Sequence, residues 1–98
     1  MKRSWVYILE CSDGTYYTGC TTNLDQRIYQ HKTGYFDGYT SKRQPVTLLW
    51  YEVFHRLDDA INAERQIKGW SRKKKEALMR GDFEWLHELA QSGEMCQR

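Results

Sequence analysis

The sequence predicts a small α+β domain in which a β-sheet packs against helices. Residues 4 to 11 and 15 to 20 are rich in aromatic and β-branched side chains, and Ser12-Asp13-Gly14 between them suits a tight turn, so these segments are typical of a β-hairpin. A helical pattern, an apolar run over residues 46 to 54 and further helical patterns follow. The chain therefore combines a few strands with several helices, which is the α+β pattern.

The hairpin turn decides which side chains meet. If Ser12-Asp13-Gly14 forms a three-residue loop with Gly14 in the left-handed region, Tyr7 lies opposite Gly19 and Tyr17 sits diagonally beside Tyr7. Both tyrosines then share one face of the sheet, and the missing side chain at Gly19 leaves an open floor beneath the two phenols. A two-residue loop would instead place the tyrosines on opposite faces.

The first helix is expected to start after Thr22 or Asn23, either of which can cap it, and to run to about Thr33, with Gly34 placed to end it.

Arg27 and His31 lie one turn apart on this helix, at the edge of an apolar face made by Leu24 and Ile28. A guanidinium and an imidazole together are suited to hold a phosphate, although a single histidine near a core is more often a structural residue.

Residues 34 to 45 lack periodicity and are expected to form a long loop. Tyr39, Lys42 and Arg43 in this loop could stack on bases and contact phosphates. The alternative is that the loop aromatics fold back over the sheet.

The apolar run after Pro45 predicts a third strand over residues 46 to 54, covered on both faces and central in the sheet. Asp58 or Asp59 can cap a second helix that extends to about Trp70. Its buried side would carry four residues, Ala60, Ala63, Ile67 and Trp70.

Ser71 can cap a short basic helix that ends near Arg80, and Asp82 can cap a last helix carrying Phe83, Leu86, Leu89 and Ala90. The chain of 98 residues is long enough for one domain, which we place at residues 1 to 90, with residues 91 to 98 as a flexible tail.

Basic side chains cluster in residues 65 to 80, although the formal net charge is only +2. Residues 81 to 97 contain acids and no Lys or Arg. The basic cluster suits a nucleic-acid backbone, and a solvated helix face is the alternative. The candidate phosphate contacts in it are Lys68, Arg72, Lys73 and Lys74.

Glu64 falls on the apolar edge of the second predicted helix, where a carboxylate must be paired, hydrated or bound to a metal. A hard divalent cation would suit it, and a salt bridge to Arg27 or Arg65 is the alternative. Tyr7 or Tyr17 could act as a base only if nearby positive charge lowered its pKa from the usual value near 10. Arg27, a metal or the basic cluster could supply that charge.

Several classes of protein are disfavoured. The three cysteines, Cys11, Cys20 and Cys96, form an odd set without metal-binding spacing, so we expect reduced thiols rather than disulfides or a structural zinc site. No apolar run approaches the length of a membrane span and the first residues lack a signal-peptide core, so we expect a cytoplasmic protein without membrane contact.

Together, Tyr7, Tyr17-Thr18-Gly19, Arg27, His31 and Glu64 resemble the GIY-YIG nuclease superfamily, in particular its small stand-alone bacterial proteins. The resemblance covers residues 4 to 80 and includes Thr40-Ser41 and the segment from Ala63 to Lys68. It implies a three-stranded antiparallel sheet flanked by helices, with the tyrosines and arginine as catalytic residues and one divalent metal, Mg²⁺ or Mn²⁺, held by Glu64. His31 would assist proton transfer or hydrogen-bond the phosphate or a tyrosine.

The reaction implied by this resemblance is hydrolysis of a phosphodiester bond in structured or damaged DNA, with a role in DNA repair. Cys20 stands where some members carry a lysine after the glycine. An unidentified protein partner could supply specificity. The alternatives are a non-catalytic nucleic-acid-binding module on the same scaffold and a protein-interaction domain that uses the acidic C-terminal segment.

Overall fold

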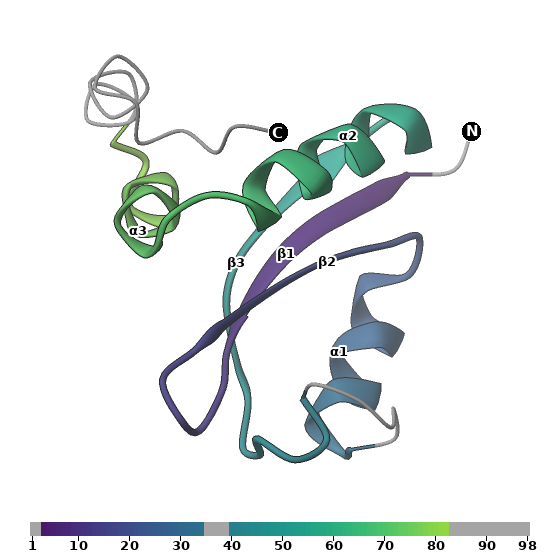
Figure 1. The fold of residues 1–98 in the computed structure, drawn as a ribbon. Helices are drawn as coiled ribbons and strands as arrows, with labels where there is room; N and C mark the ends of the chain where they lie inside the picture. The colour runs from purple at the N-terminus through teal and green to yellow at the C-terminus, as the bar shows by residue number, and fades with distance from the viewer. Residues whose placement is uncertain (1–2, 35–39, 83–98) are drawn as a thin grey trace.

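A computed structural model describes residues 3 to 34 and 40 to 82 and contains a three-stranded antiparallel sheet with three helices. Strands β1 (Ser4–Glu10) and β2 (Tyr16–Thr21) form the hairpin, and β3 (Thr47–Phe54) pairs with the other side of β1. The strand order is β2-β1-β3 (Figure 1). The predicted α+β class and antiparallel sheet are therefore confirmed.

The central strand is β1, so the prediction that the third strand lies at the centre was wrong. Four consecutive residues of β1, Val6 to Leu9, are completely buried. In contrast, β3 is an edge strand that leaves Leu49, Tyr51 and Val53 exposed, and its pairing with β1 is interrupted between Ile8 and Leu9. The apolar run of β3 resembled a strand buried on both faces because periodicity cannot distinguish that case from an incompletely covered edge.

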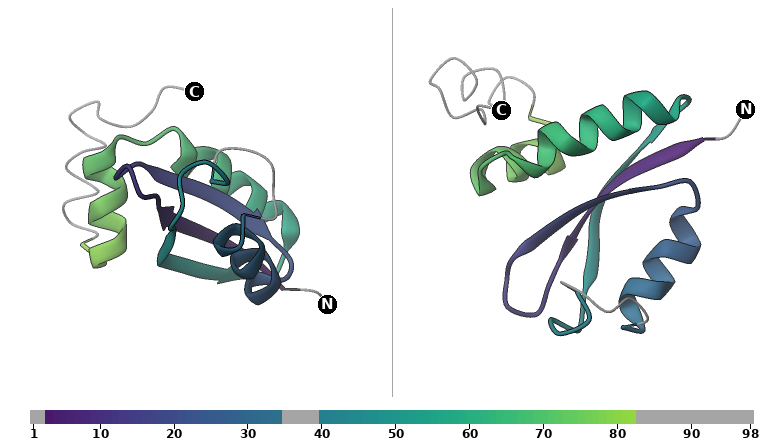
Figure 2. Two further views of the ribbon diagram at one scale, coloured as in Figure 1. Left: turned by 90° about the horizontal axis from the view of Figure 1, so that it is seen from below. Right: turned by 45° about the vertical axis from the view of Figure 1, so that its right-hand side comes forward.

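Helices cover the sheet on both faces. Helix α1 (Leu24–Lys32) lies on one face and α2 (Leu57–Lys68) on the other, as Figures 1 and 2 show. The Asn23 side chain caps α1 by accepting a hydrogen bond from the Gln26 amide at 3.1 Å. At α2 the cap position is held by Arg56 without a side-chain cap bond, so the expectation of an Asp58 or Asp59 cap was wrong. These carboxylates lie in the first turn, where the helix dipole favours negative charge.

Each face of the sheet has its own apolar core. Odd-numbered residues of β1 face α1 and even-numbered residues face α2, as expected from the alternation of side chains along a strand. On the α1 side, Tyr7 and Leu9 pack with Leu24 and Ile28 of the helix. On the α2 side, the core contains Val6, Ile8, Ala60 and Ile67, with Ala63 and Trp70 packed against it.

Helix α3 (Arg72–Arg80) follows α2 and begins and ends as predicted. The Ser71 hydroxyl accepts a hydrogen bond from the Lys74 amide at 3.3 Å, and Gly81 adopts the left-handed conformation after the last turn, with φ of 73°. The predicted final helix after Asp82 and the predicted tail lie outside the described residues. None of the helices in the described ranges has the length and apolar character needed to cross a bilayer.

Candidate functional site

The hairpin turn brings the two tyrosines to one face of the sheet. Gly14 has φ of 84°, and its amide donates to the Cys11 carbonyl at 2.9 Å, which closes the predicted three-residue loop. The resulting register pairs Tyr7 with Gly19. The rings of Tyr7 and Tyr17 are 6.5 Å apart between centroids, so the predicted arrangement of these side chains is confirmed.

The surface above Gly19 is filled rather than open, which corrects the expectation of a vacant floor. A Cβ added at Gly19 would lie 2.5 Å from Cζ of Tyr7 and would also collide with its hydroxyl oxygen. The Tyr7 phenol therefore lies directly on the glycine backbone. Glycine is required at this position because of close contact, since no left-handed backbone conformation is involved.

His31 connects the last turn of α1 to this pair of tyrosines. Its Nε2 lies 2.9 Å from the Tyr7 hydroxyl, and its Nδ1 lies 2.8 Å from the Thr40 hydroxyl. The imidazole is 4% exposed, and its ring centroid is 5.2 Å from that of Tyr17. Tyr7, Tyr17 and His31 thus form one compact cluster, with Thr40 behind it.

Burial sets the protonation of this cluster. Burial raises the pKa of Tyr7 to about 12, and the Tyr17 phenol adds to the rise while the Arg27 guanidinium opposes it. The pKa of His31 is lowered by burial and by the positive charge of Arg27. Near neutral pH the imidazole is therefore uncharged, so one of its nitrogens donates and the other accepts in the hydrogen bonds with the Tyr7 and Thr40 hydroxyls.

These protonation states separate the roles of the two tyrosines. Arg27 lowers the pKa of Tyr7 as expected, but the effect of burial is larger. Tyr7 is also completely buried, whereas Tyr17 is partly exposed. In this conformation Tyr7 is a buried hydrogen-bond partner that orients His31, and only Tyr17 of the pair can contact solvent.

Gln44 is a contributor that the sequence did not reveal. Its side-chain amide donates to the backbone carbonyl oxygens of His31 at 2.5 Å and Thr40 at 2.8 Å. These bonds hold the end of α1 and the following loop together, and so fix the residue that contacts Nδ1 of His31. The sequence indicated Thr40, because Thr40-Ser41 is part of the family resemblance. It did not indicate Gln44, which is a single amide residue in a loop without periodicity.

Glu64 belongs to α2, on the other face of the sheet from Arg27. Cys20 of the edge strand β2 is a side chain whose pKa responds to the charges of both residues. Burial and the Glu64 carboxylate raise the pKa of the Cys20 thiol, while the Arg27 guanidinium lowers it, so both charges act on this side chain. Because β2 is an edge strand, groups from α1 and α2 can approach the same edge from opposite faces.

The partner of Glu64 is Lys68, one turn later on α2, and not Arg27 or Arg65 as the salt-bridge alternative proposed. Glu64 Oε2 lies 3.1 Å from Lys68 Nζ. The glutamate side chain is only 16% exposed, whereas the lysine side chain is 57% exposed. In the described ranges, no three or more His, Cys, Asp and Glu side chains gather into a metal-binding group. Glu64 is therefore a single, largely buried carboxylate.

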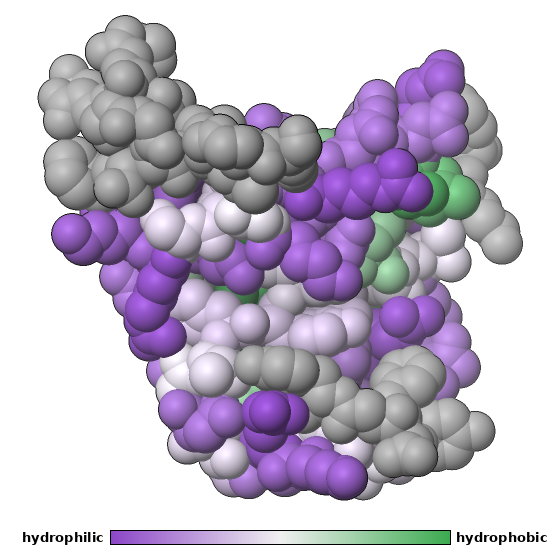
Figure 3. All heavy atoms as spheres, viewed as in Figure 1, coloured by the Kyte–Doolittle hydropathy of each residue, from purple (hydrophilic) through white to green (hydrophobic). Residues whose placement is uncertain are grey.

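The candidate phosphate-binding side chains do not form one free basic surface. Lys42 and Lys73 are exposed, while Arg43 Nε forms a 3.0 Å ion pair with Asp13 of the hairpin loop. Tyr39 lies outside the described residues. Among the residues coloured in Figure 3, hydrophilic side chains predominate and apolar ones form small separate areas.

Arg72 and Lys74 have structural contacts that the basic cluster did not predict. Arg72 donates to the Gly14 carbonyl at 2.6 Å and lies 4.1 Å from the centroid of the Tyr16 ring. Lys74 is 2% exposed, with Nζ 4.7 Å from the Trp70 ring centroid. The expected phosphate contact by Lys74 conflicts with this burial, because its ammonium group packs against an aromatic ring instead of facing solvent.

The class of protein follows from two features. One is the hairpin in which Tyr7 lies opposite Gly19, and the other is helix α1, which carries Arg27 and His31. The model of the GIY-YIG catalytic domain matches residues 3–77, and the chain belongs to this family of nuclease domains. The resemblance noted from the sequence is thus confirmed.

The individual relatives are small proteins, and this chain matches nearly their whole length. A UPF0213 protein of Halobacterium salinarum is 49% identical over 73 residues, which cover 74% of this chain and 95% of the relative. A UPF0213 protein of Syntrophus aciditrophicus is 42% identical over 81 residues, or 82% of this chain and 93% of the relative.

Two solved structures have a similar fold. The solution structure of a UPF0213 protein from Bacillus halodurans has a TM-score of 0.54 at 42% identity and covers 80% of this chain and 83% of its own. The solution structure of a protein from E. faecalis has a TM-score of 0.59 at 34% identity and covers 85% of this chain and 88% of its own.

Proposed function

We propose that the protein is a metal-dependent endonuclease that hydrolyses phosphodiester bonds in structured or damaged DNA. The observation that supports this most is the meeting of two sets of groups at edge strand β2. Arg27 and the cluster of Tyr17, Tyr7 and His31 lie on one side of it, and α2, which carries Glu64, packs on β2 from the other, so that the charges of Arg27 and Glu64 both act on the Cys20 thiol. A binding module would need basic and aromatic surface but not a largely buried carboxylate opposite a phenol and an arginine.

The chemistry of Glu64 fits one hard divalent cation. Mg²⁺ is commonly held by one or two carboxylates, with water and substrate phosphate as the other ligands, so a single glutamate is sufficient. Glu64 would hold the ion after its ion pair with Lys68 opens. When bound, such an ion supplies Lewis-acid stabilisation of charge on the phosphate oxygens. Mg²⁺ is the expected metal, and Mn²⁺ has similar ligand preferences.

The remaining residues provide the other parts of the reaction. Tyr17 is the cluster phenol that can meet water, so we assign to it the orientation of the attacking water molecule, and in its phenolate form it would take the proton of that water. The water oxygen forms a bond to phosphorus as the bond to the leaving sugar oxygen breaks, and the leaving oxygen takes a proton from solvent. Arg27 stabilises the negative charge that develops on the phosphate, an effect worth about 3 kcal/mol for such groups. Tyr7 and Thr40 hold His31 in place beside Tyr17.

The setting and partners are part of the proposal. The relatives come from bacteria and archaea, whose DNA lies in the cytoplasm, so we place the activity there. Lys42, Arg43, Lys68, Arg72 and Lys73 are the basic side chains in this account that can reach a phosphate backbone from the surface. A protein partner that supplies specificity, and a role in DNA repair, are further elements of the proposal.

The test is incubation of the protein with single-stranded, duplex, flapped and branched DNA in the presence of Mg²⁺ or Mn²⁺. Wild type should cut at least one of the structured substrates. Glu64→Gln should lose this activity, while the matched control Glu52→Gln, an exposed carboxylate on β3, should retain it. If wild type cuts none of these DNAs and binds them with a steep dependence on salt, the non-catalytic module is the better account.

A further inference from the structure

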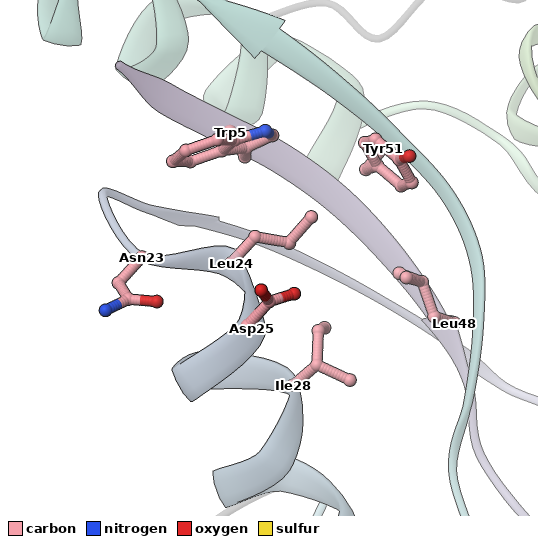
Figure 4. Close-up of a pocket in the computed structure, with 7 residues that line it drawn as sticks. All are labelled: Trp5, Asn23, Leu24, Asp25, Ile28, Leu48 and Tyr51. Atoms are coloured by element: carbon pink, nitrogen blue, oxygen red, sulfur yellow. The ribbon is translucent and has the colours of Figure 1, made fainter. Parts of the chain in front are cut away.

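A hollow lies on the same face of the sheet as the tyrosine cluster, between α1 and strands β1 and β3. Its volume is about 390 Å³, which is within the range of small-ligand sites. Figure 4 shows Trp5 and Tyr51 on the strands and Leu24 and Ile28 projecting from α1 towards them. The lining is completed by Asn23, Asp25 and Leu48.

The strand side of this hollow carries an unusually exposed aromatic residue. Tyr51 is 55% exposed and lies directly opposite Tyr7 in the pairing of β3 with β1. Trp5 is a diagonal neighbour on the same face, since it pairs with Val53, which is itself 41% exposed. Aromatic rings left uncovered on a sheet face are the usual platform on which unpaired nucleobases stack.

The helix side supplies a hydrogen-bond acceptor. Asp25 is exposed, and within the part of the chain that the structure describes its carboxylate has no ion pair or side-chain hydrogen bond. Asp25 and Arg27 are two residues apart on α1, which places them on opposite flanks of the helix. The flank facing β2 is thus positive, and the flank at the hollow is negative. A phosphate would be repelled from the hollow, whereas a group with N–H donors would be attracted.

We propose that this hollow binds an unstacked nucleobase with an exocyclic amino group, such as cytosine. Its face would stack on Tyr51 and Trp5, and its amino group would donate to the Asp25 carboxylate, a recognised pairing of an acidic side chain with cytosine. The aliphatic side chains of Leu24, Ile28 and Leu48 cover the apolar remainder of the base. The base is an unpaired one, because the hollow lies beneath a helix where a duplex cannot enter.

Only one part of this inference rests on the proposed function, namely that the bound base belongs to the DNA that the protein cuts. The two flanks of α1 are separated by about 10 Å, the diameter of a helix, so the bound base would belong to a nucleotide a few positions from the bond that is cut. The hollow would then favour DNA with an unpaired segment beside the cleavage site, and Asp25 would bias the choice of base there.

The test is a titration followed by NMR, using isotope-labelled protein that carries Glu64→Gln and contains no metal. The ligands are deoxycytidine, thymidine and a short oligodeoxycytidine. We expect the Trp5 indole N–H to shift in a saturable way, with deoxycytidine bound more tightly than thymidine and the oligonucleotide more tightly than the nucleoside. Because no cleavage or metal is required, the outcome is independent of the endonuclease proposal.

Three variants make the test specific. Tyr51→Ser should weaken binding about tenfold, as expected for loss of a stacking ring. Asp25→Asn should remove the preference for deoxycytidine over thymidine. Tyr29→Ser is the matched control, because this tyrosine is 69% exposed on α1 and does not line the hollow. The proposal is overturned if Trp5 shows no saturable shift, if Tyr51→Ser binds like Tyr29→Ser, or if the nucleoside binds and the oligonucleotide does not.

Discussion

Gly19→Ala should displace Tyr7 and disrupt the cluster without touching any catalytic atom directly. The added methyl carbon would lie 2.5 Å from Cζ of Tyr7, which is closer than non-bonded carbon atoms approach. The ring is rigid and completely buried, so it must move as a unit and would break the 2.9 Å hydrogen bond to His31. Overpacking costs about 1 to 3 kcal/mol, and leaving Nε2 unpaired costs about 1 to 3 kcal/mol more. The free energy of unfolding should therefore fall by about 2 to 6 kcal/mol.

Urea denaturation measures this loss, and two comparisons isolate its cause. Gly34→Ala changes a left-handed glycine, with φ of 71°, that has no atoms near the new methyl group, and should cost only about 1 kcal/mol. When Tyr7→Leu has already removed the ring, Gly19→Ala should cost less than about 1 kcal/mol, because the collision is gone. Equal losses from Gly19→Ala in the wild-type and Tyr7→Leu backgrounds would refute the close-contact explanation.

Three further predictions concern charge. The lowered pKa of His31 means that, as pH falls below about 6.5, the unfolded chain gains a proton before the folded one does, so stability should be lost over that interval. Urea denaturation across this interval should show a flatter profile for His31→Gln than for wild type, and an equal slope would contradict the prediction. Lys73→Met should weaken DNA binding and lower its salt dependence by about one phosphate contact, whereas the buried Lys74→Met should leave the salt dependence unchanged in a binding titration. Arg27→Ala should slow cleavage about 100-fold with little change in melting temperature, and a large fall in that temperature would show that Arg27 is mainly structural.

The hairpin was the part of the site most accessible from the sequence. A turn type fixes a register, and the register fixes which side chains share a face, so Ser12-Asp13-Gly14 predicted the pairing of Tyr7 with Gly19. The helical spacing of Arg27 and His31 likewise placed both residues on the correct side of α1. The phenol resting on Gly19 was not predictable, because side-chain rotamers depend on the surrounding packing.

Other features depended on tertiary contacts that local patterns do not contain. The run over β3 was apolar enough for a central strand, yet none of the helices within residues 3–34 and 40–82 covers the edge where Tyr51 and Val53 are exposed. A cluster of lysines in α3 is expected to face solvent, but Trp70 provides an aromatic surface on which Lys74 is buried. The raised pKa of Tyr7 follows from complete burial, which the sequence did not show.

The most direct test of the account is whether Arg27 and Glu64 act as one site on opposite faces of β2. The measurement is kcat/KM for cleavage of a branched DNA by wild type, Arg27→Ala, Glu64→Gln and the double variant with Mg²⁺. Each single variant should lose about 100-fold or more, and the double variant should be little worse than the poorer single one, as for groups that act as a unit. A shared site would be contradicted if Glu64→Gln cleaved the DNA with the kcat/KM of wild type. It would also be contradicted if the fold-loss in kcat/KM of the double variant equalled the product of the two single losses.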